Sequence, residues 1–152
     1  MITKKDMQFF KAAKREAEKS NFKNFHVGCV VVYKNHVIGR GHNSHKTSPQ
    51  QKRWNKERNF YKDGKKPVVH SIHAEMRALT SIPYPVGIDV NWSKVKVYVY
   101  RICKGKPSHK GLSKPCAACR AAIRSLGIHH VYFTEDDGYG YIKLDKEKKK
   151  EN

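Results

Sequence analysis

One histidine, one glutamate and two cysteines are spaced like the parts of a metal-dependent hydrolytic site. His73 and Glu75 are separated by one residue, and Cys116 and Cys119 form a Cys-x-x-Cys pair. One imidazole and two thiolates give zinc three protein ligands, and catalytic zinc sites keep the fourth position open, whereas structural sites close it. Zinc at an open site activates water near neutral pH. Glu75 lies close enough to His73 to move a proton from that water to a leaving amine without binding the metal.

Both motifs are expected at the beginning of a helix. Residues 71–81 predict one helix, ended by Pro83, and residues 115–126 predict another, with Pro115 near its first turn and Gly127 after its end. The first turn of a helix has free N–H groups and the positive end of the helix dipole, and both favour thiolates. A strand predicted at residues 94–101 separates the two helices.

The remaining pattern predicts an α/β domain. Residues 3–20 predict an amphipathic helix with Thr3 as its N-cap, and residues 27–33 and 36–41 predict a β-hairpin. Further strands are predicted at residues 130–134 and 139–144. Strands that alternate with helices in the second half imply parallel pairing there. We expect one domain over residues 1–142 and a basic, disordered tail over residues 143–152.

In chain order, His73, Glu75, Pro115, Cys116 and Cys119 form the H-x-E…P-C-x-x-C pattern of zinc-dependent nucleobase deaminases. Over about residues 9–134 the chain resembles the cytidine deaminase-like superfamily, and within it the deoxycytidylate, tRNA adenosine and APOBEC-type branches. The resemblance implies a three-layer α/β/α sandwich with a mixed central sheet, Zn²⁺ as cofactor, and assembly into homo-oligomers.

Two further motifs extend the resemblance. Residues 27–32 resemble the V-G-A-x-x-V strand of the superfamily, and residues 41–43 resemble its G-x-N motif. The resemblance implies that Asn43 bonds the sugar of the substrate and that the backbone N–H of Ala74 contacts the base. Residues 101–114 depart from the pattern, because the third strand of the superfamily runs almost directly into the Pro-Cys motif. This stretch must be either a strand extension or a looped-out insertion.

Strong positive charge predicts a phosphate-bearing partner. The chain carries a net charge of +19, and residues 40–66 and 101–124, which border the predicted site, together hold +14 of it. A basic surface that serves solubility is the alternative. Further candidates are residues that line the pocket or bind phosphate: His26 and Trp54 for the pocket, and His42, His45, Arg53 and Lys114 for phosphate.

The loop between the first hairpin and His73 interleaves aromatic and basic residues. Trp54, Phe60 and Tyr61 lie among its lysines and arginines. Basic side chains that hold a backbone while aromatic rings stack on bases are typical of single-strand binding. Alternatively, these rings anchor a polar loop to the body of the domain.

Composition excludes several protein classes. No apolar run approaches the roughly 18 residues of a membrane span, and the first twenty residues lack the apolar segment of a signal peptide. We therefore expect a cytoplasmic protein without a membrane partner. In that compartment the four cysteines are not expected to form disulfides.

Three functions fit the sequence. The first is hydrolytic deamination of the cytosine of a dCMP- or CMP-like nucleotide, giving uracil and ammonia. The second is deamination of cytosine or adenine within single-stranded DNA or RNA. The third is a non-catalytic nucleic-acid-binding protein stabilised by zinc. A structural zinc site would need a fourth ligand, and the candidates are Cys103, His109, His129 and His130.

Overall fold

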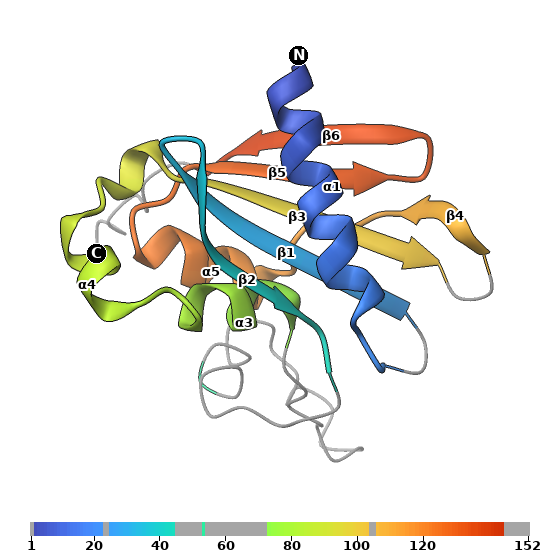
Figure 1. The fold of residues 1–152 in the computed structure, drawn as a ribbon, viewed down its shortest axis with the longest axis horizontal. Helices are drawn as coiled ribbons and strands as arrows, with labels where there is room; N and C mark the ends of the chain where they lie inside the picture. Colours follow the sequence, from blue (N-terminus) through green and yellow to red (C-terminus); the bar gives the residue numbers. More distant parts are fainter. Residues whose placement is uncertain (1, 23–24, 45–52, 54–72, 104–105, 145–152) are drawn as a thin grey trace, which may run out of the picture.

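The computed structural model describes residues 2–22, 25–44, 53, 73–103 and 106–144 (Figure 1). Its helices are α1 (Lys4–Glu18), α3 (Ala74–Thr80), α4 (Tyr84–Asp89) and α5 (Ala117–Ser125), with a 3₁₀ turn at Trp92–Lys94. Its strands are β1 (Phe25–Tyr33), β2 (His36–His42), β3 (Lys96–Cys103), β4 (Lys106–Gly111), β5 (His130–Glu135) and β6 (Gly138–Lys143).

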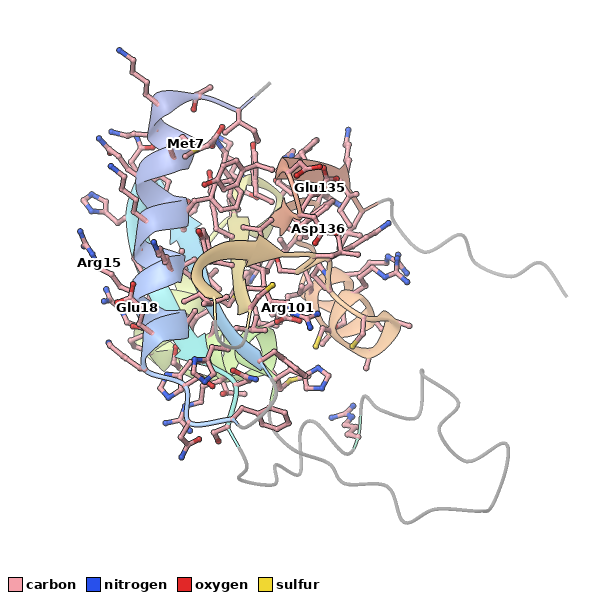
Figure 2. All side chains as sticks on the ribbon, turned by 90° about the vertical axis from the view of Figure 1, so that its right-hand side faces the viewer. Met7, Arg15, Glu18, Arg101, Glu135 and Asp136 are labelled. Atoms are coloured by element: carbon pink, nitrogen blue, oxygen red, sulfur yellow. The ribbon has the colours of Figure 1, made fainter. Side chains whose placement is uncertain are left out.

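The strands form one mixed sheet in the order β2-β1-β3-β5-β6. β1 pairs antiparallel with β2 and β3, and β3 pairs parallel with β5, which confirms the predicted antiparallel hairpin and the parallel pairing of the second half. β6 returns antiparallel along β5. Figure 2 shows the sheet edge-on, with α1 on one side and α5 on the other. The architecture is therefore the expected α/β/α sandwich.

The packing of α1 depends on a residue without a side chain. Val30 and Val32 of β1 are buried against Phe10 and the small residues of α1. Gly28 precedes these valines on the same face of β1, and a Cβ at this position would lie 2.1 Å from the backbone oxygen of Ala13. Glycine at this position thus lets the helix backbone approach the strand directly.

The opposite face of the sheet carries the core beneath α3 and α5. Cys29 and Val31 of β1 are fully buried there, together with apolar residues of β3 and β5. Ala74 and Ala78 of α3 and Ile123 of α5 belong to the same cluster. Because neighbouring residues of a strand point to opposite faces, odd-numbered residues of β1 face α3 and even-numbered ones face α1.

The basic stretch before the Pro-Cys motif is a strand extension. β3 continues past its pairing with β5, and β4 folds back along it, pairing Gly111 with Arg101 and Lys110 with Ile102. The helix α4 is not predicted from the sequence, because Pro83 and Pro85 indicate the end of a helix rather than the beginning of one. Pro85 instead lies in the first turn of α4, where a missing N–H costs nothing.

The folded domain extends beyond the predicted boundary at residue 142. Residue 142 lies inside β6, and Leu144 is buried with its backbone N donating to the His129 carbonyl at 2.7 Å. Residues 145–152, most of the predicted tail, lie outside the described residues. Among the described helices, none is long and apolar enough to cross a membrane.

A buried hydrogen bond fixes the beginning of α1 to the sheet. Asp6 completes the capping box with Thr3, and its Oδ1 accepts a hydrogen bond from the Tyr98 hydroxyl at 2.6 Å. Burial alone would raise the pKa of Asp6, but the hydrogen bonds from Thr3 and Tyr98 outweigh burial and lower it.

We expect Tyr98→Phe to lower the free energy of unfolding by about 1–3 kcal/mol, because a buried carboxylate loses a donor. Urea denaturation measures this change. The penalty should hold above about pH 4 and shrink as the pH falls through the lowered pKa of Asp6, where protonation removes the charge. The control is Tyr100→Phe, whose hydroxyl makes no hydrogen bond with any described residue. Equal effects of both variants would contradict the prediction.

Candidate active site

Two helix starts bring the three predicted ligands together. His73 is the N-cap of α3 and Cys116 the N-cap of α5, with Cys119 three residues further along α5. His73 Nδ1 lies 3.7 Å from Cys116 Sγ and 3.4 Å from Cys119 Sγ. The three ligand atoms all lie within 4.8 Å of one another.

These separations fit a tetrahedral zinc ion. Zn–S bonds of about 2.3 Å and a Zn–N bond of about 2.0 Å at the tetrahedral angle place nitrogen and sulfur about 3.5 Å apart. Both observed N···S distances lie within 0.2 Å of that value. The side chains present therefore fit zinc, with Nδ1 as the ligand atom of His73.

No fourth ligand closes this group within the described part of the chain. His129 Nδ1 bonds the Leu144 carbonyl, His130 Nδ1 bonds the Tyr141 hydroxyl, and Cys103 is not part of the group. The side chain of His109 lies outside the described residues. The arrangement of three ligands is that of a catalytic site.

The pKa values of the two thiols shift in opposite directions. The interaction with Cys119 lowers the pKa of Cys116 to about 3, against burial and with further help from His73. The same interaction, together with burial, raises the pKa of Cys119 well above its usual value. Because zinc binds thiolates, zinc binding requires Cys119 to lose its proton.

Glu75 lies beside the ligands without joining them. It occupies the first turn of α3, and its side chain is buried. Burial raises the pKa of its carboxyl, and the neighbouring His73 opposes the rise. The carboxyl also hydrogen-bonds the Cys119 side chain. This is the position expected of a group that moves protons next to the metal.

His73, Cys116 and Glu75 line a pocket of about 280 Å³. The rest of its lining comes from the segment after α1, the beginning of β1, the residue after β2, both helix starts, β3 and the segment after β4. The lining residues are Phe22, Phe25, Val27, Asn43, His73, Ala74, Glu75, Arg101, Leu112, Ser113, Lys114 and Cys116. A pocket with this lining is large enough to admit a base.

Asn43 and Ala74 lie in the pocket wall, as predicted. The Asn43 amide also holds the wall together, since Oδ1 accepts from Val27 N at 2.9 Å and from Ser20 Oγ at 2.6 Å. Nδ2 donates to the Phe25 carbonyl at 3.0 Å. Ala74 is the first residue of α3, where a backbone N–H has no partner within the helix. Their contacts with a substrate stay predictions.

His26 and His42 lie on the other face of the sheet. His26 is an even-numbered residue of β1, so it shares the α1 face while Phe25 and Val27 line the pocket; its Nε2 bonds the Phe22 carbonyl. His42 pairs with Gly28 and contacts Glu16 of α1 at 3.6 Å. Neither histidine is among the residues that line the pocket, because each points to the opposite face of the sheet; their predicted contacts with a substrate stay predictions.

The other predicted contacts have mixed outcomes. Lys114 lines the pocket and is exposed at its rim. Arg53 is exposed, but the structure describes none of its neighbours in the chain. His45 and Trp54 lie outside the described residues, as do the other aromatics of that loop.

Arg101 and Ser113 were missed as individual site residues. Ser113 Oγ donates to the Val99 carbonyl at 2.8 Å and accepts from Thr134 N at 2.7 Å. This buried serine therefore fixes the segment that leads to Cys116 to both β3 and β5. The sequence shows Arg101 only as one of the basic residues between 101 and 124. No local pattern indicates that β3 continues past its pairing with β5 and brings the Arg101 side chain to the pocket.

A family comparison agrees with this geometry. Residues 3–135 match the family model described as the cytidine and deoxycytidylate deaminase zinc-binding region. The chain belongs to this family. The family match and the His-Cys-Cys group together identify Zn²⁺ as the cofactor.

Among curated proteins, the chain is 29% identical over 126 residues to a tRNA-specific adenosine deaminase of Streptococcus pyogenes. The match covers 82% of this chain but 59% of the relative, so the chain spans little more than half of that protein.

Among solved structures, a dCMP deaminase from cyanophage S-TIM5, in complex with dCMP and dUMP, is similar at a TM-score of 0.53 and 20% identity, covering 88% of this chain and 82% of that one. A cytidine deaminase from Mycobacterium leprae has a TM-score of 0.50 and 17% identity, covering 89% and 91%. At these identities the likeness establishes the fold alone, and it confirms the expected α/β cytidine deaminase-like fold.

We expect Cys119→Ser to lose bound zinc, because one of three protein ligands loses its thiolate. Metal analysis of purified protein gives the zinc content. Cys103→Ser is the matched control and should keep one zinc per chain, since Cys103 is outside the ligand group. Zinc loss in the control variant would instead indicate a closed structural site.

Proposed function

We propose that this protein deaminates the cytosine of a dCMP- or CMP-like nucleotide, giving the uracil nucleotide and ammonia. One observation carries the proposal: one pocket is lined both by Glu75, His73 and Cys116 and by the cations Arg101 and Lys114. A base next to Glu75 would have its attached phosphate within the same pocket as these cations.

The residues of the chain have distinct tasks in this reaction. When bound, zinc supplies an activated water. Glu75 takes a proton from that water and delivers it to the ring nitrogen. It then takes the remaining proton from the oxygen newly bonded to the base carbon and delivers it to the departing amine. A new C–O bond forms at the base carbon as the C–N bond breaks, and the nitrogen leaves as ammonia. We assign the N–H of Ala74, which lines the pocket at the beginning of α3, to the carbonyl of the base.

The pocket walls suit a flat base. Phe22 and Phe25 lie with ring centroids 4.9 Å apart and present apolar surface above the floor. Asn43 has one amide hydrogen beyond its three hydrogen bonds in the wall, and we assign it to the sugar. Lys114, exposed at the rim, is assigned to the phosphate.

A polynucleotide substrate is the second candidate. It is favoured by the likeness to tRNA-specific adenosine deaminases and by a net charge larger than one phosphate requires. The target base, adenine or cytosine, would then be extruded from a single strand into the pocket. A non-catalytic binding protein is less well supported, because it gives Glu75 no role. A cytoplasmic location and homo-oligomer formation remain proposals of the sequence analysis.

We expect Glu75→Gln to keep zinc and fold while deamination falls by about 10²–10⁴-fold or more, because the amide cannot accept the proton. Turnover is measured by the absorbance change of the base, and zinc by metal analysis. Glu16→Gln, also a buried glutamate near the end of α1 but outside the pocket, is the control and should retain activity. Undiminished turnover of Glu75→Gln would remove the proposed mechanism.

Incubation with a panel of nucleosides, nucleotides and single-stranded oligonucleotides, followed by product mass, tests the substrate class. We expect dCMP or CMP to be converted. Binding of such a mononucleotide should depend weakly on salt, whereas log K for a single strand falls by about 0.7 per phosphate contact per log unit of salt. Conversion of oligonucleotides alone, with a steep salt dependence, would replace the first candidate by the second.

A further inference from the structure

The β3–β4 hairpin adds an arginine to the pocket. Arg101 lies on the part of β3 that extends beyond its pairing with β5, directly across from Val27 of β1. Its side chain lines the pocket together with Leu112 and Lys114, which follow β4. In Figure 2, Arg101 is labelled beneath the arched ribbon of β4, on the other side of the sheet from Arg15 and Glu18 of α1.

The Arg101 side chain is held in a defined orientation. Its guanidinium carbon lies 4.8 Å from the centroid of the Phe25 ring, a cation–π contact. On the β4 side, a Cβ at Gly111 would lie 3.1 Å from Arg101 Cδ. Glycine at that position therefore leaves room for the arginine stem along the strand. A stacked guanidinium has lost much of its freedom before any ligand arrives, which favours binding.

This cation has no carboxylate partner among the described residues. The ion pairs within the described residues are formed by Glu16 with Lys19 and with His42, away from the pocket. Arg101 Nη1 makes one long hydrogen bond, 3.4 Å to the Leu112 carbonyl, and its buried Nε has no partner among those residues. The guanidinium thus retains donors for an anion that enters the pocket.

We propose that Arg101 is a specificity-determining residue that binds the phosphate attached to the substrate nucleoside; this inference rests on the proposed function. A planar guanidinium presents paired N–H donors that match two phosphate oxygens. The same chemistry applies to the terminal phosphate of a mononucleotide and to a phosphodiester next to the target base in a strand. The hairpin, where the chain departs from the family pattern, is then the element that distinguishes a nucleotide from a nucleoside.

The test compares binding of dUMP, deoxyuridine and a five-nucleotide single strand containing one deoxyuridine, by calorimetry on the zinc-loaded protein. Arg101→Gln should weaken dUMP about 10- to 100-fold, because a charged hydrogen-bond donor is lost. Deoxyuridine should bind unchanged. If Arg101→Gln weakens binding of the strand but not of dUMP, Arg101 binds a phosphodiester next to the target base instead of a terminal phosphate. The affinity of Arg101→Lys for dUMP should lie between those of the wild-type protein and Arg101→Gln, since lysine keeps the charge but lacks the planar guanidinium.

Arg40→Gln is the matched control, because Arg40 is exposed on β2 and outside the pocket. It removes the same charge and should leave dUMP binding unchanged. If Arg101→Gln weakens the binding of deoxyuridine and dUMP equally, the role of Arg101 is structural. If it weakens the binding of no ligand, Arg101 has no role in binding. Either result overturns the inference, even though the wild-type protein still deaminates its substrate. Failure of the wild-type protein to deaminate any nucleobase would instead overturn the proposed function.

Discussion

The site depends on one geometric constraint. An imidazole and two thiolates from distant parts of the chain must lie close enough together to bind the same tetrahedral zinc ion. The structure meets it by packing two short helices on the same face of one sheet with their first turns together. His73 caps α3, and Cys116 caps α5. Free N–H groups at both helix starts stabilise thiolates, and thiolates are the ligands that zinc binds.

The sheet supplies the rigidity that this constraint needs. α3 and α5 share a core with β1, β3 and β5, so the separation of the helix starts follows from packing in a dense interior. Ser113 adds a polar link, since it bonds both parallel strands just before the Pro-Cys motif. Glu75 is positioned by the same helix as His73. The Glu75 carboxyl and the His73 imidazole therefore keep their relative placement.

The basic hairpin gives the pocket a character that the metal site alone does not. The zinc ligands act on the reacting carbon of the base, so contacts with the pocket walls must discriminate between substrates. Here one wall is aromatic, from Phe22 and Phe25, and another is cationic, from Arg101 and Lys114. Stacking of Arg101 on Phe25 joins the two walls into one surface. Under the proposed function, the base would contact the aromatic wall and its attached phosphate the cationic one.

The sequence by itself determined the three candidate ligands, the glutamate beside them and the order of most elements, because these follow from local spacing, capping and hydrophobic period. His73, Glu75 and the cysteine pair lie where the motif places them. Only tertiary structure decided which neighbours join them. Strand alternation and register turned His26 and His42 toward α1, and the extension of β3 beyond β5 carried Arg101 into the pocket. Those outcomes depend on pairing between segments about 75 residues apart along the chain, such as Val27 and Arg101, which no local pattern encodes.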